Sequence, residues 1–337
     1  MQRLSVPLAT LVGLLVLVYL AQTESISLYT QTVLMFMGVN VILASSLNLV
    51  NGYMGEFSCG HAGFMAVGAY VSSVLSVLLF AKDRVFGAAL LPPEWALLGF
   101  PLVLLAGGVA AAFAGLLVAL PSFRTRGDYL AIITIAANYI VISTVENLDV
   151  IGGPRGFMGM KRVVRSMGNA VDLPWMLLWT FAFTVFTIWI LRRFVYSTYG
   201  RGVSAVCQDE VAAEIMSVNT NRMKLVAFML SSGLAGVAGG LFAHVVGYVN
   251  PGSFTILKST EALVMVYLGG MASLTGSVLS AVLFTLMLEA LRPLQIIKWI
   301  VVPLLLILLM QFRPEGIMGN RELPDLFPRL RRLYRFK

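Results

Sequence analysis

The stretch LVAFMLSSGLAGVAGGLFAHVVGYVNPGSFTIL, residues 225–257, contains no Asp, Glu, Lys or Arg. A helix that crosses the hydrocarbon core of a bilayer needs about 20 apolar residues, so this stretch is long enough to cross it. One charged side chain at the bilayer centre costs about 3 kcal/mol on insertion scales. Stretches without charge therefore mark candidate membrane spans in the rest of the chain as well.

Eight other such stretches occur along the chain. One of them, residues 262–288, is interrupted by the turn-forming sequence GGMASLTG at 269–276, which divides it into two short helices. The count predicts about ten transmembrane helices. The nine stretches are residues 4–23, 25–55, 57–81, 95–123, 129–145, 173–191, 225–257, 262–288 and 299–312.

The composition of the whole chain points to the same class of protein. Of 337 residues, 58% are apolar and 12% are charged, whereas a soluble domain averages roughly 25% charged residues. The loops between ten spans are too short for a soluble domain of useful size. We therefore expect an all-α polytopic membrane protein, one transmembrane domain over residues 1–337 in contact with the lipid bilayer, and no binding to nucleic acid.

The net charge of +8 is a signal of orientation. Ten spans place both termini on one side, and if that side is the cytoplasm the inner segments hold 15 of the 24 basic residues. The loop 192–224 and the basic tail 313–337 are then cytoplasmic. The main exception is the outer loop 146–172, which carries four basic residues. Residues 4–20 also suggest a signal peptide, but they are long enough to span and lack a clear cleavage site.

Two similar links suggest a weak internal repeat. The dipeptide GY at 52–53 is followed by an apolar helix that reaches Tyr70, and GY at 247–248 is followed by one that reaches Tyr267. In the predicted topology the links lie on opposite faces of the membrane, as an inverted-topology repeat requires. Chance recurrence of Gly and Tyr near membrane interfaces explains the pattern equally well.

Motifs for catalysis within the chain are absent. There is no phosphate-binding loop GxxxxGK[ST], since none of the six lysines follows a glycine, and neither GxSxG nor HExxH occurs. Two cysteines, Cys59 and Cys207, and two histidines, His61 and His244, are too isolated for metal-ligand spacing. We expect no catalytic residues, no metal, no cofactor and no enzymatic activity.

The loop 192–224 is the one polar segment with helical periodicity. Val203, Val206, Val211, Ile215 and Val218 recur at spacings near three and four. This spacing predicts a short amphipathic helix that lies along the membrane face. A passive interfacial helix is the simplest interpretation of this pattern alone.

The same loop contains YGRG at 199–202 and QDEVAAE at 208–214. These sequences resemble the Glu-Ala-Ala loop of bacterial ABC importer permeases, whose coupling helix docks into a groove of the ATPase subunit. Ser217 stands where that motif often has Gly. The resemblance implies that this helix contacts an ATPase through a set of residues in and beside the motif, namely Arg201, Asp209, Glu210, Ala212, Ala213 and Glu214.

Six further motifs follow one another along the chain: NLVNGYMGEFSCGHAGF at 48–64, RGDYLAI at 126–132, GGPRG at 152–156, VNPGSF at 249–254, LGGM at 268–271 and RPEG at 313–316. Together they resemble the branched-chain amino acid permeases, specifically the LivM-type members, over roughly residues 28–320. The chain departs from that pattern at Glu56, where the family commonly has Gln, and at Cys59, where an aliphatic residue is usual.

This resemblance implies an all-helical permease subunit of an ATP-driven importer for branched-chain, hydrophobic amino acids in a bacterial inner membrane. It implies three kinds of partner: a homologous permease chain in a heterodimer, two cytoplasmic ATP-binding subunits and a periplasmic substrate-binding protein. Transport then proceeds by alternating access. Import of urea, short amides or other amino acids is the alternative within the family. An ion-coupled secondary transporter, from another class, would need charged groups inside the spans.

The glycine-rich stretch 52–68 suggests a break before a helix, because glycine permits a non-helical approach and then close packing. The free N–H groups at the start of a broken helix suit a carboxylate. We expect a half-helix that begins around residues 58–61 and lines the substrate pathway. The alternative is that these glycines only permit close helix packing. For Asn138 and Glu261, the alternative is an ordinary helix cap or a hydrogen bond between helices. The candidate pathway residues are Glu56, Ser58, Gly60, His61, Asn138 and Glu261.

Overall fold

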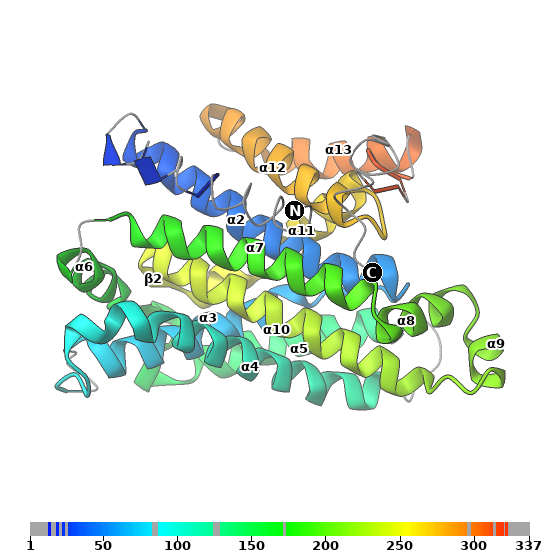
Figure 1. Cartoon of the computed structure of the whole chain (residues 1–337), viewed down its shortest axis with the longest axis horizontal. Helices are drawn as coiled ribbons and strands as arrows, with labels where there is room; N and C mark the ends of the chain where they lie inside the picture. The colour runs from blue at the N-terminus through cyan, green and yellow to red at the C-terminus, as the bar shows by residue number, and fades with distance from the viewer. Residues whose placement is uncertain are drawn as a thin grey trace, which may run out of the picture.

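The computed structural model describes most of the chain as a bundle of helices (Figure 1). Most of the predicted first span, residues 4–23, and most of the basic tail, 313–337, lie outside the described residues. The described ranges are residues 13–14, 18–19, 22–23, 26–82, 87–123, 129–170, 173–294, 298–312, 315–319 and 321–322.

The elements follow the order of the charge-free stretches. The α-helices are α2 (Leu28–Asn48), α3 (His61–Phe80), α4 (Ala96–Ser122), α5 (Tyr129–Glu146), α6 (Met160–Ala170), α7 (Trp175–Val195), α8 (Thr198–Gln208), α9 (Glu210–Ile215), α10 (Thr220–Val246), α11 (Ile256–Gly269), α12 (Leu274–Ala290) and α13 (Lys298–Phe312). A π-helical turn, Leu49–Tyr53, extends α2. Short 3-10 helices cover Pro93–Trp95, Asp149–Ile151, Gly153–Arg155, Pro251–Phe254 and Arg292–Leu294. Strands β1 (Phe157–Met158) and β2 (Tyr248–Val249) pair antiparallel.

Six helical segments of the described chain are long and apolar enough to cross a membrane, and they coincide with six of the nine charge-free stretches. The prediction of an all-α polytopic membrane protein is therefore confirmed. The stretch 262–288 is divided as predicted, since α11 ends at Gly269 and α12 begins at Leu274. The segments are Leu28–Tyr53, His61–Phe80, Pro93–Ser122, Tyr129–Glu146, Trp175–Val195 and Thr220–Val246.

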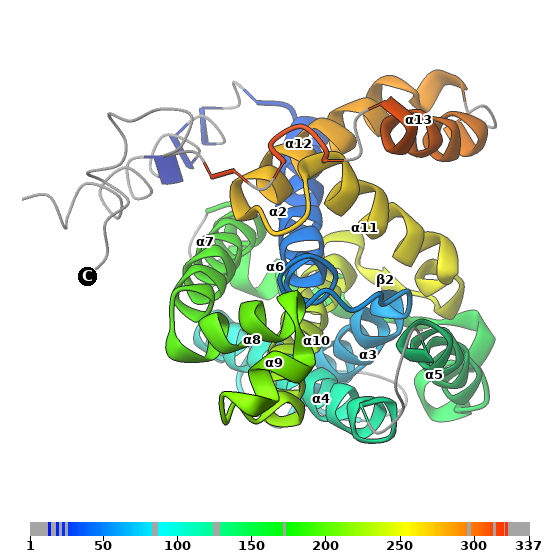
Figure 2. The same cartoon turned by 90° about the vertical axis from the view of Figure 1, so that its right-hand side faces the viewer.

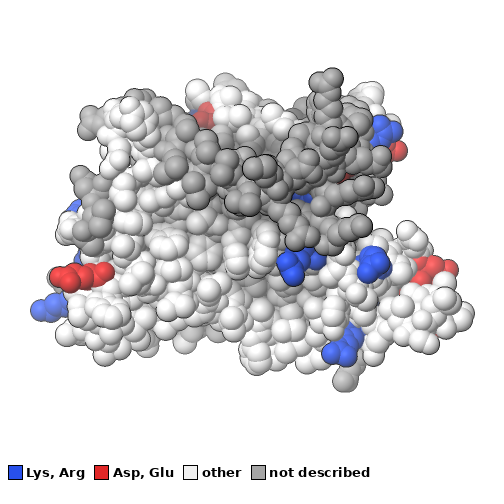
Figure 3. Space-filling model, viewed as in Figure 1, with Lys and Arg blue, Asp and Glu red and all other residues white. Residues whose placement is uncertain are grey.

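The long helices run roughly along one axis, with α6 and β2 at one end and α8 and α9 at the other (Figure 1). Charged side chains gather towards the two ends of this axis, with a largely uncharged belt between them (Figure 3). Exposed side chains on the belt are apolar, as in α4, where Leu98, Leu102, Val109 and Phe113 are exposed. This distribution is the one that a hydrocarbon environment requires.

Helix α10 lies near the middle of the bundle, next to α2, α3 and α4 (Figure 2). It approaches α3 closely because glycines face each other at the crossing. A Cβ added to Gly68 of α3 would lie 2.2 Å from the Cα of Gly236, and one added to Gly239 would lie 1.9 Å from the carbonyl oxygen of Met65. Small residues permit such close contact between helices in a membrane, where van der Waals packing drives association.

Two of the long helices end in breaks rather than in ordinary loops. After Tyr53 the chain runs without helix to Gly60, and we call residues 54–60 the inner break. After Val246, Gly247 adopts a positive φ of 73° and ends α10. The charge-free stretch 225–257 therefore extends beyond its helix, because a lack of charge does not show where a helix ends.

Substituting Gly68 with Ala should destabilise the bundle. The new Cβ meets backbone atoms of Gly236, which cannot move aside as a flexible side chain would, and overpacking of this kind costs about 1–3 kcal/mol. Gly168→Ala in α6 is the matched control, because a Cβ there meets nothing within 4 Å. The thermal unfolding midpoint of the detergent-solubilised protein should fall for G68A alone; equal midpoints would contradict this account of the helix crossing.

Candidate functional site

The predicted coupling segment forms two helices, α8 and α9, at one end of the bundle (Figure 1). The periodicity predicts a short amphipathic helix here, whereas the structure has two short helices, because Asp209 adopts an extended conformation between them. The Asp209 carboxylate accepts a hydrogen bond from the N–H of Ala212 at 3.0 Å. Asp209 thus caps the start of α9, as Asp does at many helix N-termini.

The apolar residues of this segment divide between the two helices. Val203 and Val206 of α8 are buried, whereas Val211 and Ile215 of α9 are 67% and 77% exposed. The adjacent Met216 is 78% exposed. The end of the bundle therefore presents a small apolar face, which we call the α9 face and define as Val211, Ile215 and Met216.

The residues expected to contact an ATPase lie in or directly before α9, apart from Arg201, which lies in the first turn of α8. Ala213 is buried and anchors α9 to the bundle. The others, Arg201, Asp209, Glu210, Ala212 and Glu214, are exposed.

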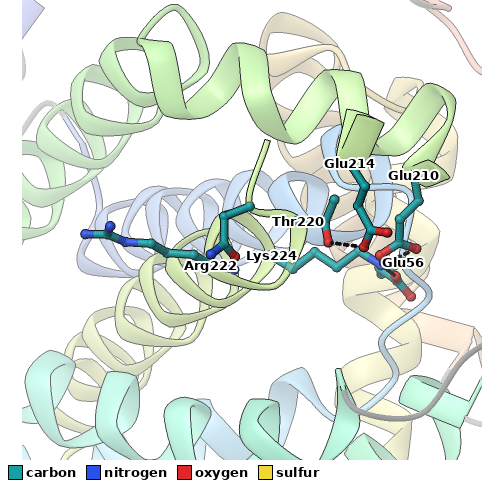
Figure 4. A network of polar contacts seen from close by, with 7 residues as sticks. Glu56, Glu210, Glu214, Thr220, Arg222 and Lys224 are labelled. Atoms are coloured by element: carbon teal, nitrogen blue, oxygen red, sulfur yellow. Dashed lines mark hydrogen bonds and ion pairs between the residues drawn. The ribbon is translucent and has the colours of Figure 1, made fainter. Parts of the chain in front are cut away.

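A buried lysine joins α9 to the inner break (Figure 4). The ammonium of Lys224, in the second turn of α10, donates to Glu56 Oε1 at 2.7 Å and to Glu210 Oε2 at 3.0 Å. The Lys224 side chain is 10% exposed, and the Glu56 side chain is 22% exposed. Glu214 accepts a hydrogen bond from the hydroxyl of Thr220 at 3.0 Å, which fastens the other end of α9 to the start of α10.

The inner break returns alongside the helix that precedes it. The Ser58 N–H donates to Asn51 Oδ1 at 3.3 Å, and His61 Nε2 lies 2.8 Å from Ser46 Oγ. Ser46 precedes Tyr53 by seven residues, so helix α3 begins about 10 Å inside the end of the preceding helix at 1.5 Å per residue. The helix starts at His61, within the range that the glycine pattern predicts.

Side chains from two other helices satisfy the N–H groups around this start. The N–H of Cys59 donates to Thr134 Oγ1 of α5 at 3.2 Å, and the N–H of Ala62 donates to Ser259 Oγ of α11 at 2.9 Å. Gly60 sits so close to α5 that a Cβ there would lie 2.0 Å from the carbonyl oxygen of Thr134. The starts of α3 and α11 therefore meet inside the bundle.

Some of the buried polar atoms without a hydrogen-bond partner in the described part of the chain lie at the same place, and others lie elsewhere in the bundle, on α7 and further along α3. Four atoms lie at this place. They are the Ser58 hydroxyl, the Asn51 amide nitrogen and both polar atoms of the Asn138 amide, all of them buried. Asn138 lies against the first turn of α3, since a Cβ on Gly63 would be 2.9 Å from its Oδ1. Buried polar groups without partners are costly, so their presence here fits a site that receives a polar ligand.

The predicted pathway residues thus fall into three places. Ser58, Gly60, His61 and Asn138 come together at the start of α3. Glu56 instead forms an ion pair with Lys224, at the end of the bundle that carries α8 and α9. Glu261 lies on α11 and pairs with Lys258, one turn away, at 2.8 Å.

Neither cysteine forms a disulfide, and within the described ranges no three His, Cys, Asp or Glu side chains are arranged to hold a metal ion. Cys207 of α8 packs on the inner break, because a Cβ on Gly55 would lie 2.7 Å from its Sγ. Burial, together with the nearby carboxylate of Glu56, raises the pKa of the Cys207 thiol. The thiol is therefore less reactive at neutral pH than an ordinary cysteine.

The sequence patterns do not single out Lys224, which the structure places between Glu56 and Glu210. In the sequence it is one basic residue of the loop 192–224. Its position offered a signal, since a lysine in the first two turns of a long apolar helix needs a partner. The sequence does not show which carboxylate supplies it, because Glu56 is 168 residues away.

Comparison with known proteins identifies the family. A family described as "Branched-chain amino acid transport system / permease component" matches residues 29–311. The permease protein LivM of a high-affinity branched-chain amino acid transport system in Escherichia coli (strain K12) is 32% identical over 304 residues, which cover 83% of this chain and 68% of that protein. LivM of Salmonella typhimurium is 30% identical, over 89% of this chain and 71% of its own length. LivH of Escherichia coli (strain K12) is 25% identical over 86% of this chain and 95% of its own length. No solved structure gives a significant match.

Proposed function

The chain belongs to the family of permease components of branched-chain amino acid transport systems, and we propose that it imports branched-chain amino acids by alternating access, driven by ATPase subunits that dock on α9. It is a transport subunit of an ABC importer, not an enzyme. The observation that carries the coupling proposal is the α9 face, an exposed apolar surface beside the Glu-Ala-Ala motif. The alternative is a passive interfacial helix, which would turn the same residues into the lipid, and binding of the ATPase subunits distinguishes the two.

The proposed partners follow from the two ends of the molecule. At the end with α8 and α9, two cytoplasmic ATP-binding subunits serve this chain and a homologous permease with which it forms a heterodimer. At the opposite end, a periplasmic binding protein delivers the substrate. LivM and LivH relatives from the same organism support the pairing of two permease chains.

The proposed topology has ten spans, with both termini cytoplasmic in a bacterial inner membrane. Residues 4–23, the short helices α11 and α12, and residues 299–312 add four spans to the six long segments. The breaks after Tyr53 and Val246 support an inverted repeat, because each leads into a helix whose start meets the other, through Ala62 and Ser259. Half-helices that meet inside the membrane are typical of transporters with such repeats.

The proposed substrate site is the start of α3, formed by Ser58, Gly60, His61 and Asn138. The positive end of a helix favours a carboxylate, and the unpartnered amide of Asn138 adds polar atoms of both kinds. Apolar side chains of a branched amino acid would pack on the surrounding helices. Urea or a short amide is the alternative substrate, since it also uses amide contacts.

The rival class, an ion-coupled transporter, gains little from the structure. It would need a carboxylate that is free to bind the coupling ion within the spans. Glu261 is paired with Lys258, and Glu56 with Lys224.

Replacing Ile215 with Asp should release the ATPase subunits. A charged group in the middle of a desolvated contact should cost at least about 2 kcal/mol, roughly thirtyfold in Kd. The measurement is co-purification of the ATPase with the tagged permease from membranes. Val150→Asp is the control, because Val150 is also exposed but lies in the loop after α5, on the other side of the membrane in this topology. Normal co-purification of I215D would exclude α9 as the docking site.

Replacing Gly60 with Ala should abolish uptake while the complex still assembles. The Cβ would collide with the carbonyl of Thr134 and displace the start of α3. Uptake of labelled leucine into proteoliposomes that contain the whole complex measures this, with competition by excess valine or urea to identify the substrate class. Gly252→Ala, at the other break, meets only a side-chain oxygen at 3.4 Å and is the control. Unchanged uptake by G60A would remove this site from the pathway.

Thiol labelling in intact cells should confirm the orientation. With Cys59 and Cys207 both replaced by Ser, a cysteine placed at exposed Gln208 of α8 should react with a membrane-impermeant maleimide only after the cells are permeabilised. In the same background, a cysteine placed at exposed Asn169 of α6 should react from outside. The reverse pattern would show that the membrane orientation is inverted.

A further inference from the structure

Three separate parts of the chain meet at one ammonium group. Lys224 belongs to the central helix α10, Glu210 opens α9, and Glu56 lies in the inner break (Figure 4). An ammonium carries three donors, so it can hold both carboxylates at once. No other ion pair in the described part of the chain joins three elements; the remaining two each link residues three apart.

The contact is more than a surface ion pair. The Lys224 side chain is 10% exposed, and it reaches Glu56 at 2.7 Å and the nearer oxygen of Glu210 at 2.9 Å. Exposed pairs are screened by water and contribute little. The contact between Lys224 and Glu56 is shielded from water, whereas the Glu210 side chain is 47% exposed. Charge-assisted hydrogen bonds are shorter and stronger than neutral ones, so both carboxylates are held at the same ammonium group.

Each carboxylate leads to a different functional part. Glu210 is the first residue of α9, whose apolar face points away from the bundle. Glu56 precedes the start of α3 by five residues, and the chain between them has no helix to absorb a displacement. Lys224 itself is held at the base of α10, which packs on α2, α3 and α4. The ammonium therefore links α9 to the segment that leads into α3.

We propose that Lys224 is the residue that transmits movement of α9 to the inner break, so that docking and closure of the ATPases shift the start of α3. Lys224 is a positioning residue, because its ammonium holds the carboxylates of Glu56 and Glu210 next to each other. This inference rests on the proposed function, because it assumes that α9 binds the ATPase. It adds a route by which that binding reaches the substrate site.

The test uses the assembled transporter, with its ATPase subunits and binding protein, in proteoliposomes. Two quantities are measured together: ATP hydrolysis and uptake of labelled leucine. For Lys224→Met we expect the ATPase to co-purify and to hydrolyse ATP, while leucine moved per ATP falls roughly tenfold, within the range of measured allosteric couplings. Lys224→Arg keeps the charge and both contacts, and it should restore most of the ratio.

Two further variants separate coupling from folding and from charge. K224M leaves the shielded Glu56 carboxylate without its partner. The double variant K224M/E56Q removes that unpaired charge, and we expect its ratio of leucine moved per ATP to fall as much as that of K224M. Arg222→Met removes an exposed cation two residues away, whose side chain points away from the cluster (Figure 4). R222M should transport like the unchanged protein.

The outcomes are distinct. A normal ratio of leucine to ATP in K224M, or an equal loss in R222M, overturns the role of Lys224. Loss of ATPase binding in both K224M and K224M/E56Q also overturns it, because Lys224 would then only support docking. Failure of the unchanged permease to bind any ATPase would instead refute the proposed function.

Discussion

Hydrocarbon offers no hydrogen-bond partner, so every backbone N–H inside the bilayer must find one within the protein. Continuous helices meet this requirement automatically, but the inner break does not. Here the N–H groups of Ser58, Cys59 and Ala62 are taken up by Asn51, Thr134 and Ser259, from three different helices. The break can exist only because α2, α5 and α11 surround it, and their side chains fix where α3 begins.

Close packing of these helices depends on the absence of side chains. Gly60 lies against the carbonyl of Thr134, and Gly68 against Gly236 of α10. The same crowding leaves the hydroxyl of Ser58 and the amide of Asn138 without partners among the described residues. The glycines therefore bring the helices together around buried polar atoms, and these atoms form the proposed substrate site.

The two ends of the inner break differ in physical character. Towards α3 it is held by neutral hydrogen bonds to buried polar side chains, and towards α9 by a shielded ion pair. In the function proposed above, this one short segment joins the docking surface to the substrate site.

Local sequence patterns determine many of the helices and one of the helix starts in this protein. Six charge-free stretches predicted six helices, the glycines predicted a helix start near residue 60, and Asp209 carries the residue type of a helix cap. The valine periodicity predicted a short amphipathic helix where the structure has two, because spacing does not show that the backbone is extended at Asp209. The contacts of Lys224 with Glu56 and of Ala62 with Ser259 were decided only by the tertiary structure. They join residues 168 and 197 positions apart, and such contacts depend on how whole helices pack, which no local sequence pattern records.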